Sequence, residues 1–372
     1  MKIAQINMIL YGSTGKIMLQ IAETARKHGH EVRTYSTIPF DKNEHAASIP
    51  TENHFVWGSE KENQLHYYLG TALGRNGCFS KKGTAELIAD LKAFQPDIVH
   101  LHNLHKFCIN LPMLFHYLKE SNVRTVWTLH DCWAMTGQCP YFTMVKCEQW
   151  MSHCSYCPQT RRYPACYGKG AASQNFDRKR EAFTGVKNMT LITPSQWLAD
   201  LVKQSFLKEY PVEVHYNTID TNVFKPTPSD FRERYGLVGK KIVLGVASIW
   251  DERKGLRDFY KLAQMLDDQY AIVLVGLSEK QIKELPKNIL GIRRTNSPQE
   301  LAAIYTAADV FFNPTYEDNY PTVNLEAEAC GTRVVTYDVG GCKETIHLKG
   351  SQTLPVGCVD EMLMLIRKDA AN

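Results

Sequence analysis

The sequence predicts an α/β protein of two domains, each a parallel sheet with helices on both faces. Its 372 residues suit two domains better than one. Short apolar runs alternate with amphipathic stretches from residue 3 onward, and the alternation restarts at residues 240–247. A polar, proline-containing stretch at 222–230 has the composition of a linker. We expect a first domain over residues 1–205 and a second over 206–372.

The first half contains the elements of one Rossmann-like unit. Residues 3–9 predict a strand, which a small-residue loop at 10–15 connects to a helix ending near 28–29. Further strands are expected at 31–35, 96–102, 123–131 and 190–195, and further helices at 86–94 and 196–205.

The second half repeats this architecture. Strands are expected at 240–247, 270–276 and 309–313 and from 334 onward, with helices at 298–308, from 321 or 322 to 331, and at 359–368. We expect the last helix to pack back onto the first domain.

Composition excludes several classes of protein. Apolar residues make up 44% and charged residues 22% of the chain, which argues against wholesale disorder. The net charge of +4 is too small to indicate a nucleic-acid-binding protein. No apolar run approaches the roughly 20 residues of a membrane span, and the first ten residues fit a strand better than a signal peptide. We therefore expect a cytoplasmic protein.

The stretch 314–341 carries the clearest functional signal. A buried strand ends at Pro314, a polar loop follows, and a helix then begins, so unpaired backbone N–H groups face the carboxyl end of the sheet. This geometry suits a phosphate. Asp318 in the loop and Glu326 on the helix suit sugar hydroxyls on either side of a pyrophosphate. The alternative for Asp318 is a helix N-cap.

Residues 318–331 with Gly340 and Gly341 resemble the E-x7-E block of retaining GT-B glycosyltransferases of glycosyltransferase family 4. Asp318 stands where that family usually has Glu. The resemblance implies that Asp318 contacts the donor sugar and Glu326 the ribose. It also implies that the backbone after Asp318 contacts sugar and diphosphate, through Asn319, Tyr320, Pro321 and Thr322.

Cations are expected opposite this helix, because they can neutralise a leaving diphosphate. Lys254-Gly255 matches the lysine-glycine pair of the resembled family, whose preceding arginine is replaced here by Ser248, so Arg253 is the substitute. The alternative for Lys254 is a surface lysine. In the first half, Gly15 belongs to a loop that the resemblance places near donor phosphate or acceptor; a tight turn is the alternative.

Polar residues also end two strands of the first half. His102 follows one strand, and His130 and Asp131 follow another, at the sheet edge where α/β proteins bind ligands. The resemblance assigns His102 to the transferred sugar, and His130 and Asp131 to the acceptor or sugar side. A structural role is the alternative for His102. Strand alternation puts His100 and His102 on one face, which argues against a metal site.

Six of the eleven cysteines fall between Cys132 and Cys166. We interpret this insertion, residues 132–170, as an ordered flap over the acceptor side. Buried thiols or adventitious disulfides are an equal alternative to a structural zinc ion held by four of them: Cys139, Cys147, Cys154 and Cys157. No catalytic metal is expected.

Basic and aromatic residues alternate at 150–180, which suits a membrane surface or a lipid diphosphate acceptor; a solvated face is the alternative. The functional hypothesis is a retaining hexosyltransferase of cell-surface polysaccharide or capsule synthesis. Its donor would be a nucleoside diphosphate sugar, with a UDP-sugar preferred over a GDP-sugar, and its acceptor a saccharide or a polyprenyl-diphosphate-linked saccharide. No cofactor is expected to be required for catalysis. We also expect peripheral contact with the plasma membrane. The alternatives are a non-hydrolysing nucleotide-sugar epimerase and a non-catalytic zinc- or redox-responsive module that binds sugar nucleotides.

Overall fold

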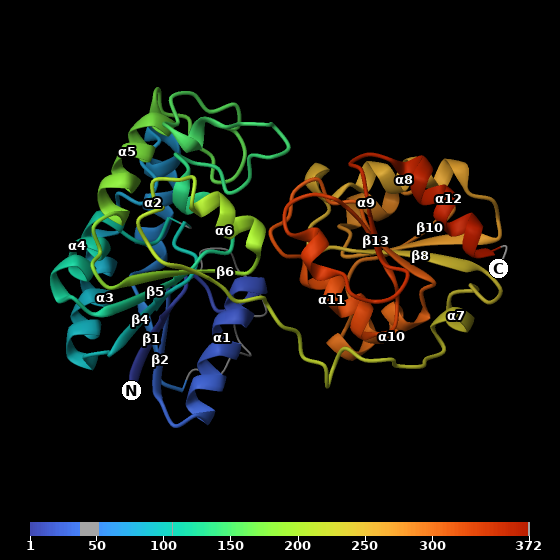
Figure 1. Cartoon of the computed structure of the whole chain (residues 1–372), viewed down its shortest axis with the longest axis horizontal. Helices are drawn as coiled ribbons and strands as arrows, with labels where there is room; N and C mark the ends of the chain where they lie inside the picture. Colours follow the sequence, from blue (N-terminus) through green and yellow to red (C-terminus); the bar gives the residue numbers. More distant parts are fainter. Residues whose placement is uncertain (38–51, 106, 371–372) are drawn as a thin grey trace. The chain divides into compact units, whose positions relative to one another are not determined.

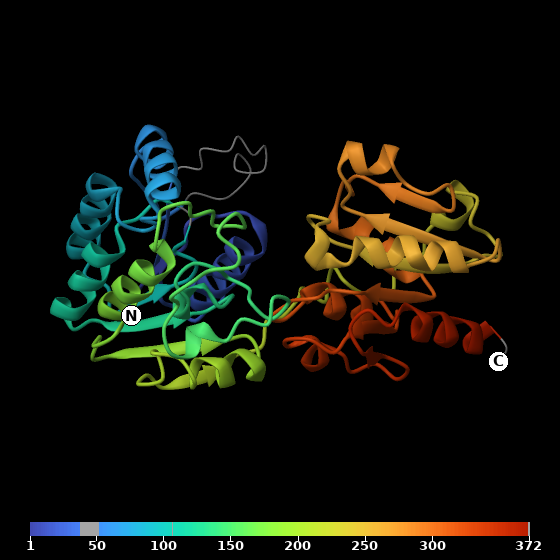
Figure 2. The ribbon, with the colours of Figure 1, turned by 90° about the horizontal axis from the view of Figure 1, so that it is seen from above.

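The structure is a computed structural model that describes residues 1–37, 52–105 and 107–370. The chain divides into two compact units, Met1–His215 and Tyr216–Asn372. Each unit contains one sheet of parallel strands, with helices on both sides of it (Figures 1 and 2). The predicted α/β class with two Rossmann-like units is confirmed.

The sheet of the first unit has seven parallel strands in the order β3-β2-β1-β4-β5-β6-β7. The order reverses beside β1, so β1 and β4 flank the switch point at which such sheets bind ligands. Because β7 pairs with β6, the first unit extends past position 205. The strands are β1 (Lys2–Ile6), β2 (Glu31–Thr37), β3 (His54–Trp57), β4 (Ile98–Leu101), β5 (Arg124–Thr128), β6 (Met189–Thr193) and β7 (Val212–Val214).

Six α-helices of the described chain cover this sheet: α1 (Gly12–Lys27), α2 (Glu60–Leu73), α3 (Lys81–Phe94), α4 (Leu111–Ser121), α5 (Ala171–Phe183) and α6 (Gln196–Val202). Helices α3, α4 and α5 pack side by side, and α1 packs on β1 and β2. Buried aromatic rings fill the space between helix and sheet; Phe115 of α4 lies 5.3 Å from Trp127 of β5 and 4.4 Å from Phe183 of α5, between ring centroids. Such interdigitated aromatic packing contributes much of the stability of a core.

The second unit has six parallel strands in the order β10-β9-β8-β11-β12-β13, with its switch point between β8 and β11. The strands are β8 (Lys241–Val246), β9 (Tyr270–Val275), β10 (Ile289–Ile292), β11 (Val310–Asn313), β12 (Val334–Tyr337) and β13 (Gln352–Leu354). The helices are α7 (Phe231–Arg234), α8 (Leu256–Met265), α9 (Glu279–Lys283), α10 (Pro298–Ala307), α11 (Thr322–Ala329) and α12 (Val359–Ala370).

The terminal helix α12 packs against α8 within the second unit. Its residues Val359, Met362 and Ile366 belong to the same buried cluster as Phe259 of α8. Packing of α12 onto the first unit stays a prediction. Among the residues that the structure describes, no helix combines the length and the apolar character needed to cross a bilayer.

Candidate active site

Two loops meet at the switch point of the second unit. One follows β8 and carries Lys254; the other follows β11 and carries Asp318. The Nζ atom of Lys254 forms an ion pair with Oδ2 of Asp318, and the two side chains are only 17% and 15% exposed. The structure therefore brings together the predicted diphosphate and donor-sugar residues, which are 64 positions apart in the chain.

Hydrogen bonds to backbone groups hold these two loops together. The Arg253 guanidinium donates a hydrogen bond to the carbonyl of Glu317 at 2.8 Å, and the carbonyl of Arg253 accepts one from the N–H of Tyr316 at 2.7 Å. Gly255 has φ +71°, and a Cβ there would lie 2.2 Å from the Pro314 carbonyl oxygen, so a side chain would separate the loops. Arg253 thus holds the loop that presents the donor-sugar carboxylate, and its contact with a diphosphate stays a prediction.

The buried carboxylate of Asp258 also supports this loop through hydrogen bonds. Asp258 of α8, only 1% exposed, accepts hydrogen bonds from the hydroxyls of Tyr316 at 2.8 Å and Tyr337 at 2.9 Å, and pairs with Lys261. Burial and then the Asp258 hydrogen bond raise the pKa of Tyr316 to about 12, so its hydroxyl keeps its proton. Sequence reasoning missed this support, because no local pattern links these positions.

Helix α11 continues from this loop. Its N-cap is Pro321, which makes no side-chain capping hydrogen bond to the first turn. Thr322 is its first residue, and Glu326 lies one turn further on. The hydroxyl of Tyr305 donates to Oε2 of Glu326 at 3.1 Å and orients that carboxylate.

The remaining predicted donor residues, Asn319 and Tyr320, are 4% and 8% exposed. The Tyr320 ring stacks on Tyr216, with centroids 5.4 Å apart. Gly340 has φ +55°, and a Cβ there would lie 1.8 Å from the Asp318 carbonyl oxygen. The predicted glycine turn therefore packs directly on the backbone of the donor loop.

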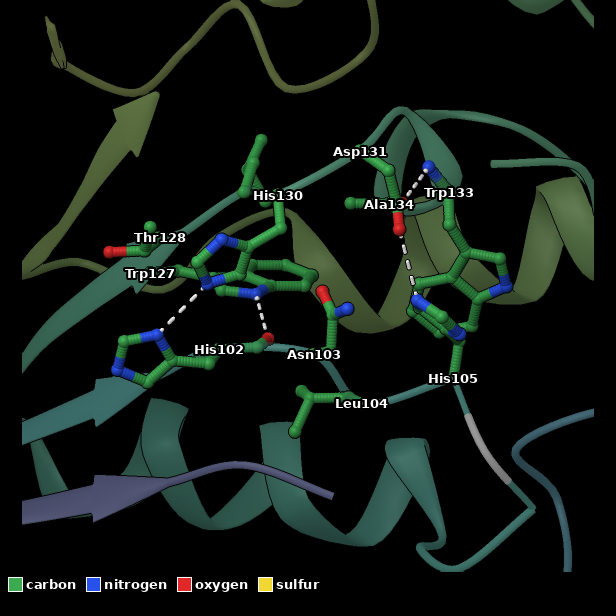
Figure 3. Close-up of a pocket in the computed structure, with 11 residues that line it drawn as sticks. His102, Asn103, Leu104, His105, Trp127, Thr128, His130, Asp131, Trp133 and Ala134 are labelled. Atoms are coloured by element: carbon green, nitrogen blue, oxygen red, sulfur yellow. Dashed lines mark hydrogen bonds and ion pairs between the residues drawn. The ribbon is translucent and has the colours of Figure 1, made fainter. Parts of the chain in front are cut away.

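The first unit has a small pocket at the carboxyl ends of β4 and β5 (Figure 3). Inside it, His102 Nδ1 lies 3.1 Å from Nε2 of His130, and His102 Nε2 lies 2.8 Å from Oε1 of Gln5 on β1. The indole of Trp127 donates to the His102 carbonyl at 2.9 Å. His102 is 1% exposed and both its ring nitrogens are engaged, so a direct sugar contact would require one of these bonds to open.

The histidines form a neutral stack. The rings of His100 and His102 lie 4.4 Å apart, on one face of the strand as predicted, and those of His102 and His130 lie 5.3 Å apart. Burial, followed by repulsion from neighbouring imidazoles, holds the pKa of His102 well below its usual value. Burial lowers the pKa of His130 to about 4, against the opposing effect of Asp131. All three rings are uncharged at pH 7.

Asp131 has a partner that sequence analysis did not assign to the site. Its Oδ2 lies 3.1 Å from Nε2 of His105, and its Oδ1 accepts the backbone N–H of Trp133 at 2.8 Å. The other nitrogen of His105, Nδ1, lies 2.9 Å from the Tyr163 hydroxyl. The polar residues after β4 could have indicated His105, whereas nothing in the sequence indicates Tyr163.

Gly15 lies in the first turn of α1, beside the carboxyl end of β1. A Cβ there would lie 2.4 Å from the Leu10 carbonyl oxygen, so glycine lets the helix pack on the preceding loop. Asn7 reinforces this turn by donating to Oγ1 of Thr14 at 3.3 Å. A contact of Gly15 with phosphate stays a prediction.

The insertion at 132–170 is held on the first unit by a buried lysine. The Lys179 ammonium donates to the carbonyls of Trp133 at 2.7 Å and Thr136 at 3.0 Å, and burial lowers its pKa to about 7. Trp133 and Trp150 belong to the core of the unit. The insertion therefore packs on the first unit, and its role as a flap over the acceptor side stays a prediction.

The eleven cysteines, all in the described chain, form no disulfide. A hydrogen bond from Cys139 lowers the pKa of Cys157 to about 7, and electrostatic interactions link this pair to Cys154. Yet among the residues that the structure describes, no three His, Cys, Asp or Glu side chains are grouped so that they could hold a metal ion. Zinc binding by Cys139, Cys147, Cys154 and Cys157 therefore stays a prediction that this geometry does not favour.

Comparison with solved structures identifies the class of fold. A sucrose-phosphate synthase from Thermosynechococcus elongatus aligns with a TM-score of 0.70 and 16% identity, covering 100% of this chain and 90% of its own. Anabaena HepE in complex with UDP-glucose aligns with a TM-score of 0.67 and 16% identity, over 99% of this chain and 89% of its own. WaaG, a lipopolysaccharide glycosyltransferase, aligns with a TM-score of 0.61 and 15% identity, over 100% and 90%. The chain has the GT-B fold of glycosyltransferases.

Comparisons with protein families and with related sequences identify the glycosyltransferase family. Residues 14–223 match Glycosyltransferase Family 4, and residues 240–367 match Glycosyl transferases group 1. WcaC of Escherichia coli K12, a glycosyl transferase named for colanic acid biosynthesis, is 24% identical over 74% of this chain and 68% of its own. A Campylobacter jejuni N,N'-diacetylbacillosaminyl-diphospho-undecaprenol alpha-1,3-N-acetylgalactosaminyltransferase is 32% identical over 29% of each chain. This chain belongs to glycosyltransferase family 4 and is an enzyme, which sets aside the epimerase and the non-catalytic module.

Proposed function

We propose that the chain is a retaining glycosyltransferase of cell-surface polysaccharide synthesis. It would transfer a hexosyl group from a nucleoside diphosphate sugar to a saccharide or lipid-linked saccharide. We infer that the donor is a UDP-sugar in preference to a GDP-sugar. The observation that carries this proposal is the pairing of Lys254 with Asp318 at the switch point of the second unit. A cation for a diphosphate and a carboxylate for sugar hydroxyls lie in contact where α/β sheets bind nucleotides.

The leaving group is stabilised by positive charge from the protein. Lys254 has three N–H donors, so it can keep Asp318 while it binds a diphosphate oxygen. The N-terminus of α11, whose N-cap makes no side-chain hydrogen bond, adds the backbone N–H groups of its first turn and the positive end of its dipole. These groups supply the charge that a departing diphosphate needs, and we expect turnover without added divalent metal.

The remaining donor contacts follow from the two carboxylates. Glu326, oriented by the Tyr305 hydroxyl, accepts hydrogen bonds from the ribose. Asp318 orients the hexose. Because the Asp318 carboxylate is paired with Lys254, it is a weak nucleophile, and we assign front-face displacement within one ion pair, which keeps the anomeric configuration and gives an α-linked product.

Relatives and surface features support the acceptor assignment. The Campylobacter jejuni relative is named for an undecaprenol-linked acceptor and an alpha linkage, and an Acholeplasma laidlawii relative, 29% identical over 40% of this chain and 48% of its own, is named a processive diacylglycerol alpha-glucosyltransferase. In the first unit, α2 exposes Leu65, Tyr68 and Leu73 at 57%, 67% and 53%. Exposed apolar side chains on one helix suit peripheral contact with the inner face of the plasma membrane.

A screen of UDP- and GDP-sugars tests this function. Each sugar nucleotide is added to the full chain in EDTA, and thermal stabilisation and hydrolysis are measured. We expect one UDP-sugar to raise the melting temperature and to be hydrolysed slowly. The anomeric coupling constant of the transferred sugar is then read by NMR; an inverted product would exclude the retaining reaction, and no response to any sugar nucleotide would exclude the donor site.

A further inference from the structure

An exposed tyrosine of the second unit rests on the donor loop, which we define as residues 316–321. The rings of Tyr216 and Tyr320 are stacked, with their centroids 5.4 Å apart and their planes inclined by 28°. Tyr320 is only 8% exposed, whereas Tyr216 is 53% exposed. Tyr216 is the first residue of the second unit. The stack therefore joins the beginning of this unit to a loop that lies far away in the sequence.

A second contact fixes the orientation of the Tyr216 ring. Glu344 lies in the short 3₁₀ helix Cys342–Thr345, which follows the glycine pair at 340–341. Its carboxylate accepts a hydrogen bond from the Tyr216 hydroxyl, and burial followed by this carboxylate raises the pKa of Tyr216. Burial, followed by the influence of Tyr216 and Glu344, raises the pKa of Tyr320 to about 12. Both phenols keep their protons at neutral pH, so two uncharged rings form the stack.

The donor loop is supported at successive positions along its length. At its start, the N–H of Tyr316 donates a hydrogen bond to the loop after β8 at 2.7 Å. In its middle, the carbonyl of Asp318 accepts a hydrogen bond from the N–H of Gly341 at 3.3 Å. Near its end, the Tyr216 ring covers Tyr320, and the next residue is the N-cap of α11. The stack is therefore the support nearest to the first turn of α11, where the proposed function places the diphosphate.

We propose that Tyr216 is a positioning residue for the donor: by stacking on Tyr320, it holds the end of the donor loop in the arrangement that binds sugar and diphosphate. This rests on the proposed glycosyl transfer. An aromatic pair contributes attraction beyond the area that it buries. Without the Tyr216 ring, the loop spends less time in the competent arrangement, and the apparent affinity for the donor falls by the same fraction. A saturating donor restores that arrangement, so KM changes while kcat does not.

The competing role for Tyr216 is only to cover a buried ring. Loss of the ring would then lower the melting temperature and leave the donor KM of the folded enzyme unchanged. A second aromatic pair of the same unit provides a matched control. Tyr235, 39% exposed, packs against the buried ring of Phe231 with centroids 4.8 Å apart. Phe231 belongs to α7, so this pair lies outside the donor loop.

The test compares three variants of the full chain below the melting temperature of each. Tyr216→Ala removes the ring, Tyr216→Phe keeps the stack and removes the hydroxyl, and Tyr235→Ala is the control. Hydrogen–deuterium exchange of peptides that cover residues 314–326 reports on the donor loop without any ligand. Isothermal titration with UDP and with GDP measures nucleotide affinity. Steady-state kinetics with the donor found in the sugar-nucleotide screen separate KM from kcat.

We expect Tyr216→Ala to speed exchange over 314–326 at least about threefold and to raise the donor KM about fivefold, with kcat within about twofold of the wild type. Tyr216→Phe should stay within about twofold in every measurement, because the stack remains. Tyr235→Ala should lower the melting temperature similarly, with loop exchange and donor KM as in the wild type. Wild-type exchange or wild-type KM in Tyr216→Ala, or an equal rise of KM in Tyr235→Ala, would overturn the proposal. Failure of the glycosyl-transfer proposal is distinct: no sugar nucleotide would then bind the wild type, while exchange still decides whether Tyr216 holds the loop.

Discussion

Replacement of Lys254 by methionine separates the stability role of its ion pair from its role in turnover. Methionine keeps an aliphatic stem and removes only the charge. Exposed ion pairs contribute about 0.2–1 kcal/mol, and loss of one partner of a fully buried pair costs about 3–5 kcal/mol. With side chains 17% and 15% exposed, the pair with Asp318 lies between these limits, and we expect a loss of about 2 kcal/mol. For a unit of this size, that lowers the melting temperature by about 4–8 °C.

The effect on turnover should be larger and should not be reversible by a second mutation. Loss of one group that stabilises charge in the transition state costs about 100- to 1,000-fold in kcat. The double variant Lys254→Met with Asp318→Asn removes the unpaired carboxylate, so its stability should return to within about 1 kcal/mol of the wild type. Its kcat should stay as low as that of Lys254→Met.

A double-mutant cycle from thermal unfolding, combined with donor turnover in EDTA, measures both effects. Lys280→Met is the control, because that lysine is 84% exposed and lies 4.0 Å from its partner; it should change stability by less than about 0.5 kcal/mol. The donor-site reasoning is refuted if Lys254→Met turns over like the wild type. Additive stability changes in the cycle would show instead that the ion pair contributes nothing.

Three further predictions address other parts of the two units. Glu326→Gln should keep the tyrosine hydrogen bond and raise the donor KM at least about tenfold in steady-state kinetics; an unchanged KM would remove the ribose role. Gly340→Ala should abolish turnover, because the new Cβ would lie 1.8 Å from a donor-loop carbonyl, whereas Gly331→Ala, with its nearest neighbour at 3.9 Å, should cost only about 1 kcal/mol in denaturant unfolding. Burial lowers the pKa of His100 to about 3 and that of His130 to about 4, so below about pH 6.5 the unfolded chain binds more protons than the folded chain. The free energy of unfolding should therefore fall between about pH 6.5 and 4, by up to about 1.4 kcal/mol per pH unit for each histidine, and a flat profile in denaturant titrations would contradict the buried neutral stack.

The sequence predicted well those helices and strands whose boundaries are marked by short, local patterns. The strand expected at 309–313 is β11 (Val310–Asn313), and the helix expected from 321 or 322 is α11 (Thr322–Ala329). An apolar run, a proline and a terminal glycine mark these boundaries within a few residues. Because the switch point follows from strand order, the same patterns also placed Lys254 and Asp318 at one edge of a sheet.

Hydrogen-bond partners distant in the chain could not be predicted in this way. Gln5 and His102 are 97 positions apart, and Tyr305 and Glu326 are 21 apart on different helices. The 132–170 insertion lacks the periodicity that identifies helices and strands, so sequence gave no reason to place Tyr163 beside His105. These pairings depend on tertiary packing, which local propensity does not encode.

The buried position of His102 bears on how the resemblance should be applied to this chain. The resemblance assigns a sugar contact to that residue, but its ring is 1% exposed and bound on both sides, to Gln5 and to His130. Gln5 Oε1 accepts a hydrogen bond from the Nε2–H of the neutral His102 imidazole, which leaves Nδ1 to accept a hydrogen bond from the Nε2–H of His130. His130 is half-buried and is the next residue in this chain of bonds. His102 therefore fixes which nitrogen of His130 carries the proton, and through His130 it can influence a ligand without touching one.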